Sequence, residues 1–313
     1  MILGKAISDY RILAWLNYGE SRCVYKVYHS LHGRIYALAL LQAPPALESP
    51  MQRLFLEKHE LSAGLDHPSV ARVYSLVTLG ELAGVPLELV PGPTLWDKIK
   101  DGQSSFDFAL RVAIQTTEGL GAAHSIGLVH GRLTPKCLVV SSEGGLRILD
   151  FSMAFLPDEL AWPKSQLDLP FASLSLPLSG PPPEAYLSPE QLEGFPGDPS
   201  SDLYSLGLIL YELLGGRFIV QSDFPESIRQ QTLELDLPDL GEVRPDASSH
   251  WSKLLHKLTR KKASERYPSA EVLLADLKKL RDGWPPPHLS FTQKNKDISR
   301  RSFFLRFLGE ERK

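Results

Sequence analysis

Residues with reactive side chains gather around one predicted hairpin near the middle of the chain. Apolar runs at 138–140 and 146–149 flank the turn-forming residues 141–145, which predicts two short strands joined by a tight turn. The segment before the first strand carries five reactive residue types, at His130, Arg132, Thr134, Lys136 and Cys137. The carboxylate of Asp150 follows the second strand. Arg132 stays protonated at ordinary pH, so it cannot act as a base at this place.

The elements that position this segment are predicted on both sides of it. Alternating apolar residues predict strands at 12–16, 23–28 and 35–41, and further strands at 70–77 and 86–90. Helical spacing predicts a helix over 50–65, with Leu54, Leu61 and Leu65 facing inward. A longer amphipathic helix over 106–127 leads into the hairpin, with a buried stripe of Leu110, Val112, Ala113, Leu120, Ala122 and Ala123. The apolar run 203–214 contains Glu212 and is too short to span a bilayer, so we expect a buried helix there.

The residues around the hairpin carry a resemblance to a known family. His130, Leu133, Pro135, Asp150 and Phe151 match the spacing of the catalytic loop and the Asp-Phe-Gly loop of eukaryotic-type protein kinases. The resemblance extends from about residue 10 to residue 280 and points to the bacterial Hanks-type serine/threonine kinases. It implies an α+β, bilobal protein kinase-like fold, with a small β-rich N-lobe at 10–90 and a larger helical C-lobe at 91–282. Residues 283–313 would then form a proline linker and a basic amphipathic tail.

Several positions depart from the kinase pattern. The family places its catalytic Asp, a phosphate-contacting Lys and a metal-binding Asn where this chain has Arg132, Thr134 and Cys137. The lysine of the third strand and its glutamate partner on the next helix fall on Ala39 and Lys58. Lys58 is therefore expected to be a solvated surface side chain.

The resemblance also implies a vestigial nucleotide site. Its expected members are Gly19 and Arg22 in the glycine-rich loop, Val24, Ala37 and Val139 against adenine, the backbone of Glu88 and Val90, and Asp150 as the one metal ligand. Leu87 takes the gatekeeper position. No cofactor is expected to be required, and ATP and magnesium are expected to bind weakly at most.

A second set of residues is expected to maintain the architecture. The set is His130, Phe151, Glu190, Asp202 and Arg266. By the resemblance, Arg266 pairs with Glu190, and Asp202 accepts hydrogen bonds from the backbone around His130.

The lost residues lead to a hypothesis about activity. We predict a degenerate family member, a pseudokinase that is not an enzyme and acts as a protein-binding, scaffold or regulatory module in signalling. The alternative is a divergent active serine/threonine kinase. It would use Arg22, which stands where the with-no-lysine kinases place a substitute lysine, or Lys136, in place of the missing lysine.

Composition restricts the remaining function classes. The 313 residues are 43% hydrophobic and carry a formal net charge of −3, which predicts a globular chain that binds no nucleic acid. Two cysteines and the lack of a signal-peptide pattern indicate a cytoplasmic protein. The segment 288–313 interleaves aromatic and basic residues, so it is a candidate for docking to a protein partner or to the anionic inner face of a membrane. A tail that frays or folds back is the competing interpretation.

Overall fold

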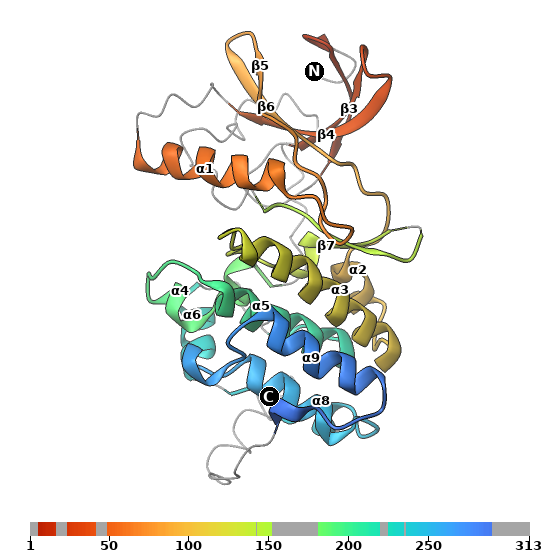
Figure 1. The fold of residues 1–313 in the computed structure, drawn as a ribbon, viewed down its shortest axis with the longest axis vertical. Helices are drawn as coiled ribbons and strands as arrows, with labels where there is room; N and C mark the ends of the chain where they lie inside the picture. Colours follow the sequence, from red (N-terminus) through yellow and green to blue (C-terminus); the bar gives the residue numbers. More distant parts are fainter. Residues whose placement is uncertain are drawn as a thin grey trace, which may run out of the picture. The chain divides into compact units, whose positions relative to one another are not determined.

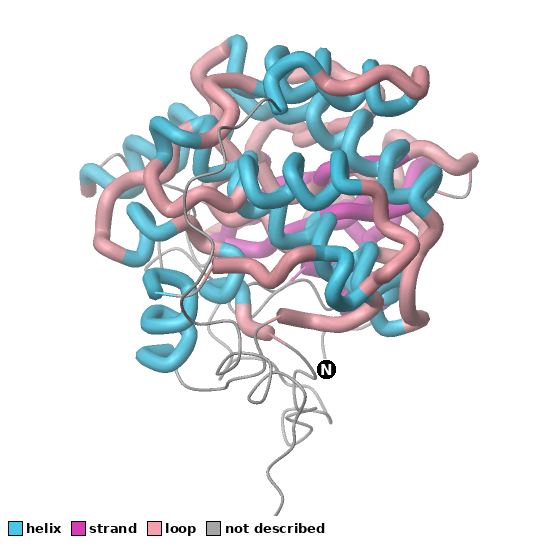
Figure 2. Tube along the Cα trace, turned by 90° about the horizontal axis from the view of Figure 1, so that it is seen from below, coloured by secondary structure: helices cyan, strands magenta, loops and turns pink. Residues whose placement is uncertain are grey.

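The protein is described by a computed structural model that covers residues 6–16, 24–41, 49–141, 143–151, 181–219, 225–234 and 236–289. The chain forms two compact units, the first from Met1–Asp97 and Gln115–Ser179, the second from Lys98–Ile114 and Gly180–Lys313. The described strands all belong to the first unit, and the described part of the second unit consists of helices and turns (Figure 1; helices are cyan in Figure 2). The predicted hairpin therefore groups with the strands of the N-terminal segment.

A six-stranded antiparallel sheet forms the body of the first unit. Its order is β1-β2-β3-β4-β6-β5, with bounds β1 Ala6–Ile7, β2 Tyr10–Leu16, β3 Val24–His29, β4 Arg34–Leu41, β5 Val77–Leu79 and β6 Leu82–Leu87. The strands predicted at 12–16, 23–28 and 35–41 are confirmed, with small differences at their ends. Side chains alternate between the two faces, so Val24 and Ala37 join one apolar cluster while Tyr25 and Leu38 join another.

The segment predicted as a strand over 70–77 is mostly irregular, so that prediction is wrong. It makes isolated bridges instead, from Val70 to Ile148 and from Val73 to Leu87. The N–H of Ala71 donates to the carbonyl of Ile148 at 2.9 Å. Its backbone is thus paired with two different partners, which explains why a strand-like sequence forms no continuous strand here.

Helix α1 (Pro50–Gly64) lies against the sheet with a face that the sequence did not indicate. Ser49 caps its start, accepting a hydrogen bond from the N–H of Gln52 at 3.1 Å. The buried residues of the helix are Gln52, Phe55, His59 and Ser62, whereas the predicted inward residues Leu54, Leu61 and Leu65 are only partly buried. Phe55 is fully buried in the apolar cluster that contains Ala39. Burial of Phe55 in this cluster therefore determines which face of the helix points inward.

The predicted hairpin and the helix before it are confirmed. Helix α2 (Leu95–Lys100) and helix α3 (Phe106–Ser125) precede a single 3₁₀ turn, η1 (Pro135–Cys137), and the strands β7 (Leu138–Val140) and β8 (Leu146–Ile148). Two residues after the end of helix α3, Gly127 has a left-handed φ of 74°. The N–H of Gly127 donates to the carbonyl of His124 and that of Leu128 to the carbonyl of Ala123, both at 3.0 Å. This Schellman end aims the chain toward His130.

The second unit is built around helix α5 (Pro199–Gly215). Asp198 caps its start, accepting a hydrogen bond from the N–H of Ser201 at 3.0 Å, and Gly216 ends it with a φ of 67°. Its residues from Ser201 to Leu214 are all buried, so the buried helix predicted over 203–214 is confirmed. The other described elements are η4 (Pro183–Tyr186), α4 (Pro189–Leu192), α6 (Pro225–Glu234), α7 (Leu240–Val243), α8 (Ser249–Leu258), η5 (Ala263–Glu265), α9 (Ala270–Arg281) and η6 (Pro287–Leu289).

The segment predicted as a linker after residue 282 packs against helix α9 through residues 287–289. The buried carboxylate of Asp276 on α9 accepts hydrogen bonds from the N–H of His288 at 3.2 Å and lies 2.8 Å from the Nδ1 of that residue. Leu289 is buried as well, with 3% of its surface exposed. Residues 287–289 therefore belong to the second unit, and the rest of the predicted tail lies outside the described residues.

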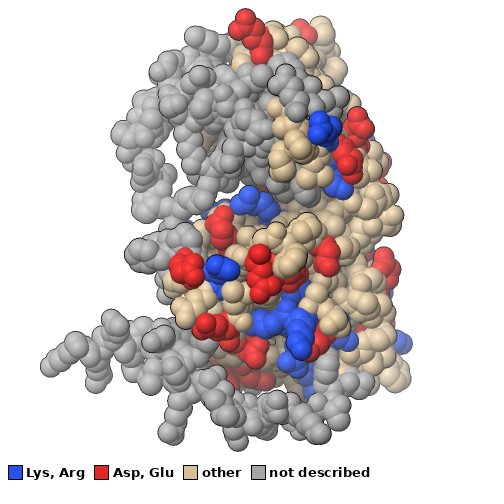
Figure 3. Space-filling view, turned by 90° about the vertical axis from the view of Figure 1, so that its left-hand side faces the viewer, with Lys and Arg blue, Asp and Glu red and all other residues tan. Residues whose placement is uncertain are grey.

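Two features bear on localisation and on partners. No helix among the described residues is long and apolar enough to cross a membrane. On the face that Figure 3 shows, Lys and Arg side chains lie among Asp and Glu side chains. The prediction that the protein binds no nucleic acid stays a prediction.

Candidate functional site

A pocket in the first unit is lined by four of the eight residues predicted to contact a nucleotide, Val24, Ala37, Glu88 and Asp150. Val24 lies on β3, Ala37 on β4 and Leu87 at the end of β6, and Glu88 directly follows β6. Leu149 and Asp150 directly follow β8. The remaining lining residues are Ala71, Arg72 and Val73. The pocket thus combines an apolar wall with the charged residues Arg72, Glu88 and Asp150, which suits a flat apolar ring that carries a charged group.

The chain segment after β6 is fixed by close backbone contacts. The carboxylate of Glu88 accepts a hydrogen bond from the N–H of Arg72 at 2.9 Å and lies 3.4 Å from the guanidinium of Arg147. Val90 and Val139 belong to one apolar cluster with Leu149. A Cβ built on Gly92 would lie 2.0 Å from the carbonyl oxygen of Val140, so only glycine fits there. The predicted backbone positions of Glu88 and Val90 are therefore held in place beside the pocket.

His130 connects the two ends of the hairpin. Its ring Nε2 lies 2.9 Å from the carbonyl oxygen of Leu149, and its ring centre lies 4.9 Å from that of Phe151. Asp150, between these two partners, has a φ of 70°, a left-handed conformation that is strained for a residue other than glycine. The strain persists because both neighbours of Asp150 are held, and it fixes where the carboxylate lies.

The three residues that replace the kinase catalytic set contact one another. The Oγ1 of Thr134 lies 3.4 Å from the Sγ of Cys137, and this Sγ donates to the carbonyl of Arg132 at 3.8 Å. Thr134 and Cys137 are each 8% exposed, whereas the side chain of Arg132 is exposed. Lys136 places its ammonium 4.3 Å from the ring centre of Trp96. That contact must break before Lys136 can reach a phosphate.

Ala39 and Lys58 do not face each other as their kinase counterparts would. Ala39 is 1% exposed within an apolar cluster. Lys58 is not the solvated side chain that we predicted: it is only 18% exposed, and its ammonium donates to the carbonyl of Gly127 at 3.4 Å and lies 3.2 Å from the carboxylate of Glu57. The prediction is wrong because the turn of α1 brings position 58 against the end of α3. Gly19 and Arg22 lie outside the described residues.

The predicted ion pair of the second unit is present. Two nitrogens of Arg266 donate to the two oxygens of Glu190 at 2.7 and 2.8 Å, and the arginine side chain is fully buried. Burial alone would raise the pKa of Glu190, but the hydrogen bonds from Arg266 and from Ser201 outweigh it and lower the pKa to about 2. Asp202 is buried on α5, and its expected contact with the backbone near His130 joins different units and stays a prediction.

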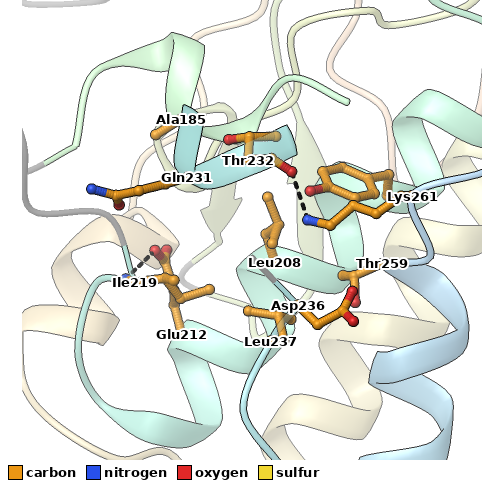
Figure 4. Close-up of a pocket in the computed structure, with 11 residues that line it drawn as sticks. Ala185, Leu208, Glu212, Ile219, Gln231, Thr232, Asp236, Leu237, Thr259 and Lys261 are labelled. Atoms are coloured by element: carbon orange, nitrogen blue, oxygen red, sulfur yellow. Dashed lines mark hydrogen bonds between the residues drawn. The ribbon is translucent and has the colours of Figure 1, made fainter. Parts of the chain in front are cut away.

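A second pocket, inside the second unit, contains titratable groups that sequence reasoning missed (Figure 4). Glu212 is 2% exposed, and it accepts hydrogen bonds from the N–H of Ile219 and from the hydroxyl of Tyr186, both at 2.8 Å. Burial raises the pKa of Glu212 to about 8. Lys261 donates to the carbonyl of Thr232 at 2.6 Å, and burial lowers its pKa to about 8. The only signal in the sequence was a carboxylate inside an apolar run.

Comparison with known proteins identifies the family. The chain belongs to the protein kinase domain family, which matches residues 10–277. The serine/threonine-protein kinase PrkC of Bacillus subtilis is 28% identical over 280 residues, which cover 89% of this chain and 41% of PrkC. The serine/threonine-protein kinase Pkn2 of Myxococcus xanthus is 30% identical over 270 residues, which cover 84% of this chain and 31% of Pkn2. The chain therefore spans less than half the length of these relatives.

A solved structure shows the same fold. The kinase domain of Mycobacterium tuberculosis PknI superposes with a TM-score of 0.68 at 21% identity, covering 90% of this chain and 99% of that domain. The predicted α+β protein kinase fold, with a β-rich N-lobe and a helical C-lobe, is confirmed. So is the predicted bacterial serine/threonine kinase family.

The relatives correct the prediction that the chain is not an enzyme. They are named as serine/threonine-protein kinases, which points to an enzyme, so that prediction is wrong. The prediction rested on the absence of the usual kinase residues at four motif positions, which are Ala39, Arg132, Thr134 and Cys137 in this chain. Phosphoryl transfer depends mainly on positioning and on stabilising charge, and residues elsewhere in a site can supply both.

Proposed function

We propose that the chain is a divergent serine/threonine protein kinase domain that takes ATP into the pocket of the first unit. The observation that carries the proposal is the lining of that pocket, where Val24, Ala37 and Leu149 form an apolar wall and Asp150 adds a carboxylate. An adenine ring suits the wall, and the phosphates would then extend toward the carboxylate.

The reaction that we propose moves the γ-phosphoryl group from ATP to a serine or threonine hydroxyl. The bond from the γ-phosphorus to the oxygen of the leaving ADP breaks, and a new phosphorus–oxygen bond forms to the hydroxyl. The hydroxyl proton passes to water, because Arg132 cannot accept it. The loose transition state of this reaction makes little demand on a base, so Arg132 can instead stabilise negative charge on the phosphates.

A magnesium ion fits this site only in part. Asp150 supplies one hard oxygen ligand, and magnesium commonly binds through one or two carboxylates together with substrate phosphates. The thiol of Cys137, where the family has an amide, suits softer metals. No group of three metal-binding side chains is assembled among the described residues. We therefore propose a single magnesium ion, held weakly by Asp150 and the nucleotide.

The missing lysine needs a substitute, for which the sequence offers Arg22 and Lys136. The ammonium of Lys136 lies 4.3 Å from the ring centre of Trp96, which favours the other candidate. The resemblance places Arg22 in the glycine-rich loop, so we propose that Arg22 provides the cation for the phosphates.

The test is transfer of labelled γ-phosphate from ATP to the chain itself or to a generic protein substrate. Asp150→Asn should abolish the transfer, and Asp107→Asn, an exposed carboxylate at the start of α3, serves as the matched control. Arg22→Ala should lower the rate by more than about tenfold, because it removes a cation at the transferred group. Lys136→Ala should change the rate by less than about twofold. Absence of any transfer that depends on Asp150 would refute the proposal.

A scaffold or regulatory role stays a second candidate beside catalysis. It is favoured by the intact network around Arg266 and Glu190, which maintains architecture and not chemistry. The proposed docking segment for a protein partner or an anionic membrane surface is the tail after Leu289. Flotation with anionic liposomes, comparing the full chain with a chain that ends at Leu289, tests the membrane part of this proposal.

A further inference from the structure

The contact of Lys58 links helix α1 to the segment that carries the catalytic residues. Lys58 stands where kinases have the glutamate that pairs with the strand lysine, yet its ammonium donates to the carbonyl of Gly127. Gly127 closes helix α3, and Leu128 and Val129 connect it to His130. The side chain of Lys58 therefore connects α1 to the entry of the catalytic segment.

Electrostatics favours a cation at this place. The carbonyls at the C-terminal end of a helix carry partial negative charge, and a lysine beside them is stabilising. The bonds of Gly127 and Leu128 to His124 and Ala123 show that this end of α3 is fully formed. The side chain of Lys58 is 18% exposed, so its charge is screened less than that of a fully exposed lysine.

The neighbouring Glu57 does not explain why Lys58 is held. The ammonium of Lys58 lies 3.2 Å from the carboxylate of Glu57, but Glu57 is on the same helix and its side chain is 63% exposed. An exposed ion pair of this kind contributes little to stability. The Gly127 contact, which joins residues 69 positions apart in the sequence, is the one that relates two elements.

The strand beside α1 shows why a kinase-like ion pair is absent. Ala39 on β4 and Phe55 on α1 belong to one buried apolar cluster. A glutamate at position 58 would find no lysine on β4, which runs Arg34–Leu41. Position 58 instead carries a positive charge, and its ammonium donates to the carbonyl of Gly127 after α3.

We propose that Lys58 is a positioning residue, which holds α1 to the end of α3 and so fixes the His130 segment for phosphoryl transfer. The proposal rests on the proposed kinase function for its effect on rate, but not for its effect on structure. In this chain a contact between α1 and α3 takes the place of the contact between α1 and the strand.

The test uses three variants of the full chain. Lys58→Met keeps the aliphatic stem and removes the charge, Lys58→Arg restores a donor, and Glu57→Gln removes only the neighbouring carboxylate. Amide hydrogen exchange followed by mass spectrometry is measured for peptides covering 50–64 and 124–131. We expect Lys58→Met to speed exchange in both peptides by about two- to fivefold, Lys58→Arg to restore it, and Glu57→Gln to leave it unchanged.

The rate of phosphate transfer gives the second readout. Lys58→Met should lower kcat while the KM for ATP stays within about twofold, because Lys58 does not touch the nucleotide pocket. Faster exchange in α1 alone, or an equal effect of Glu57→Gln, would overturn the proposal. If the unmodified chain transfers no phosphate, the proposed function fails, and the exchange experiment still decides whether Lys58 joins the two elements. A lowered kcat that Lys58→Arg does not recover would also count against it.

Discussion

The buried carboxyl group of Glu212 should make the stability of the protein depend on pH in an unusual direction. Its pKa is raised from an ordinary value of 4.5 to about 8, and the largest cause is burial, which the hydrogen bonds from Ile219 and Tyr186 offset only in part. Between pH 4.5 and pH 8 the folded state therefore holds a proton that the unfolded chain has lost. The contribution of this group to the unfolding free energy is full below pH 4.5 and is lost as the pH rises to 8.

The size of the effect follows from the shift. A shift from 4.5 to about 8 corresponds to about 5 kcal/mol over the whole window, most of which falls between pH 5 and pH 8. Glu212→Gln keeps the shape and a neutral acceptor for the N–H of Ile219, and its amide can donate to the hydroxyl of Tyr186 (Figure 4). The variant should therefore lose this pH dependence and be more stable than the unmodified chain at pH 8.

Urea unfolding at pH 5 and pH 8 measures the difference. From pH 5 to pH 8 the unfolding free energy of the unmodified chain should fall by about 3–4 kcal/mol more than that of Glu212→Gln. Glu193→Gln, which alters an exposed carboxylate after α4, should behave like the unmodified chain. Equal pH dependence in Glu212→Gln and in the unmodified chain would show that Glu212 does not hold its proton in this window.

Three further changes test other parts of the structure. Arg266→Ala leaves the carboxylate of Glu190 without its buried partner and should lower the unfolding free energy by about 3–5 kcal/mol in urea unfolding, and an unchanged midpoint would contradict this. Burial lowers the pKa of His59, whose ring nitrogens have no hydrogen-bond partner among the described residues. The contribution of the neutral ring to stability is therefore full above pH 6.5 and is lost as the pH falls from 6.5 through the lowered pKa of the folded state. His59→Leu should therefore raise the melting temperature more at pH 5.5 than at pH 7.5, and a uniform change would argue against protonation of the ring. Gly92→Ala should lower the melting temperature far more than Gly144→Ala, because both glycines have positive φ but only the first meets another backbone atom.

The parts of the fold that the sequence predicted well depend on local patterns. The strands of the sheet, the hairpin and helix α5 follow from alternation, turn residues and apolar runs within short windows. The strand prediction for residues 70–77 failed because the backbone of this segment pairs with Ile148 and with Leu87. The pattern within the segment cannot indicate partners so distant in the sequence. The prediction of the buried face of α1 failed for a related reason, since Phe55 joins an apolar cluster made by strands of the sheet, which the spacing of leucines within the helix cannot indicate.

The candidate site shows the same limit. Glu190 and Arg266 could be paired from the sequence because each stands in a recognisable kinase motif. The contacts of Lys58 with Gly127 and of Glu212 with Tyr186 involve residues that no motif relates. These contacts depend on how deeply each side chain is buried and on which way it points, and both follow only from the folded structure.

The docked residues 287–289 have a practical consequence for any experiment that shortens or extends the chain. A chain cut at Gly283 would lose the hydrogen bonds of His288 to Asp276 and the buried side chain of Leu289, although helix α9 would be complete. A fluorescent reporter fused directly after Leu289 would start from a packed residue and would rotate with the second unit. The same reporter fused after Gly283 would lack these contacts and would rotate more independently. Fluorescence anisotropy of the two fusions would measure how firmly that anchor holds.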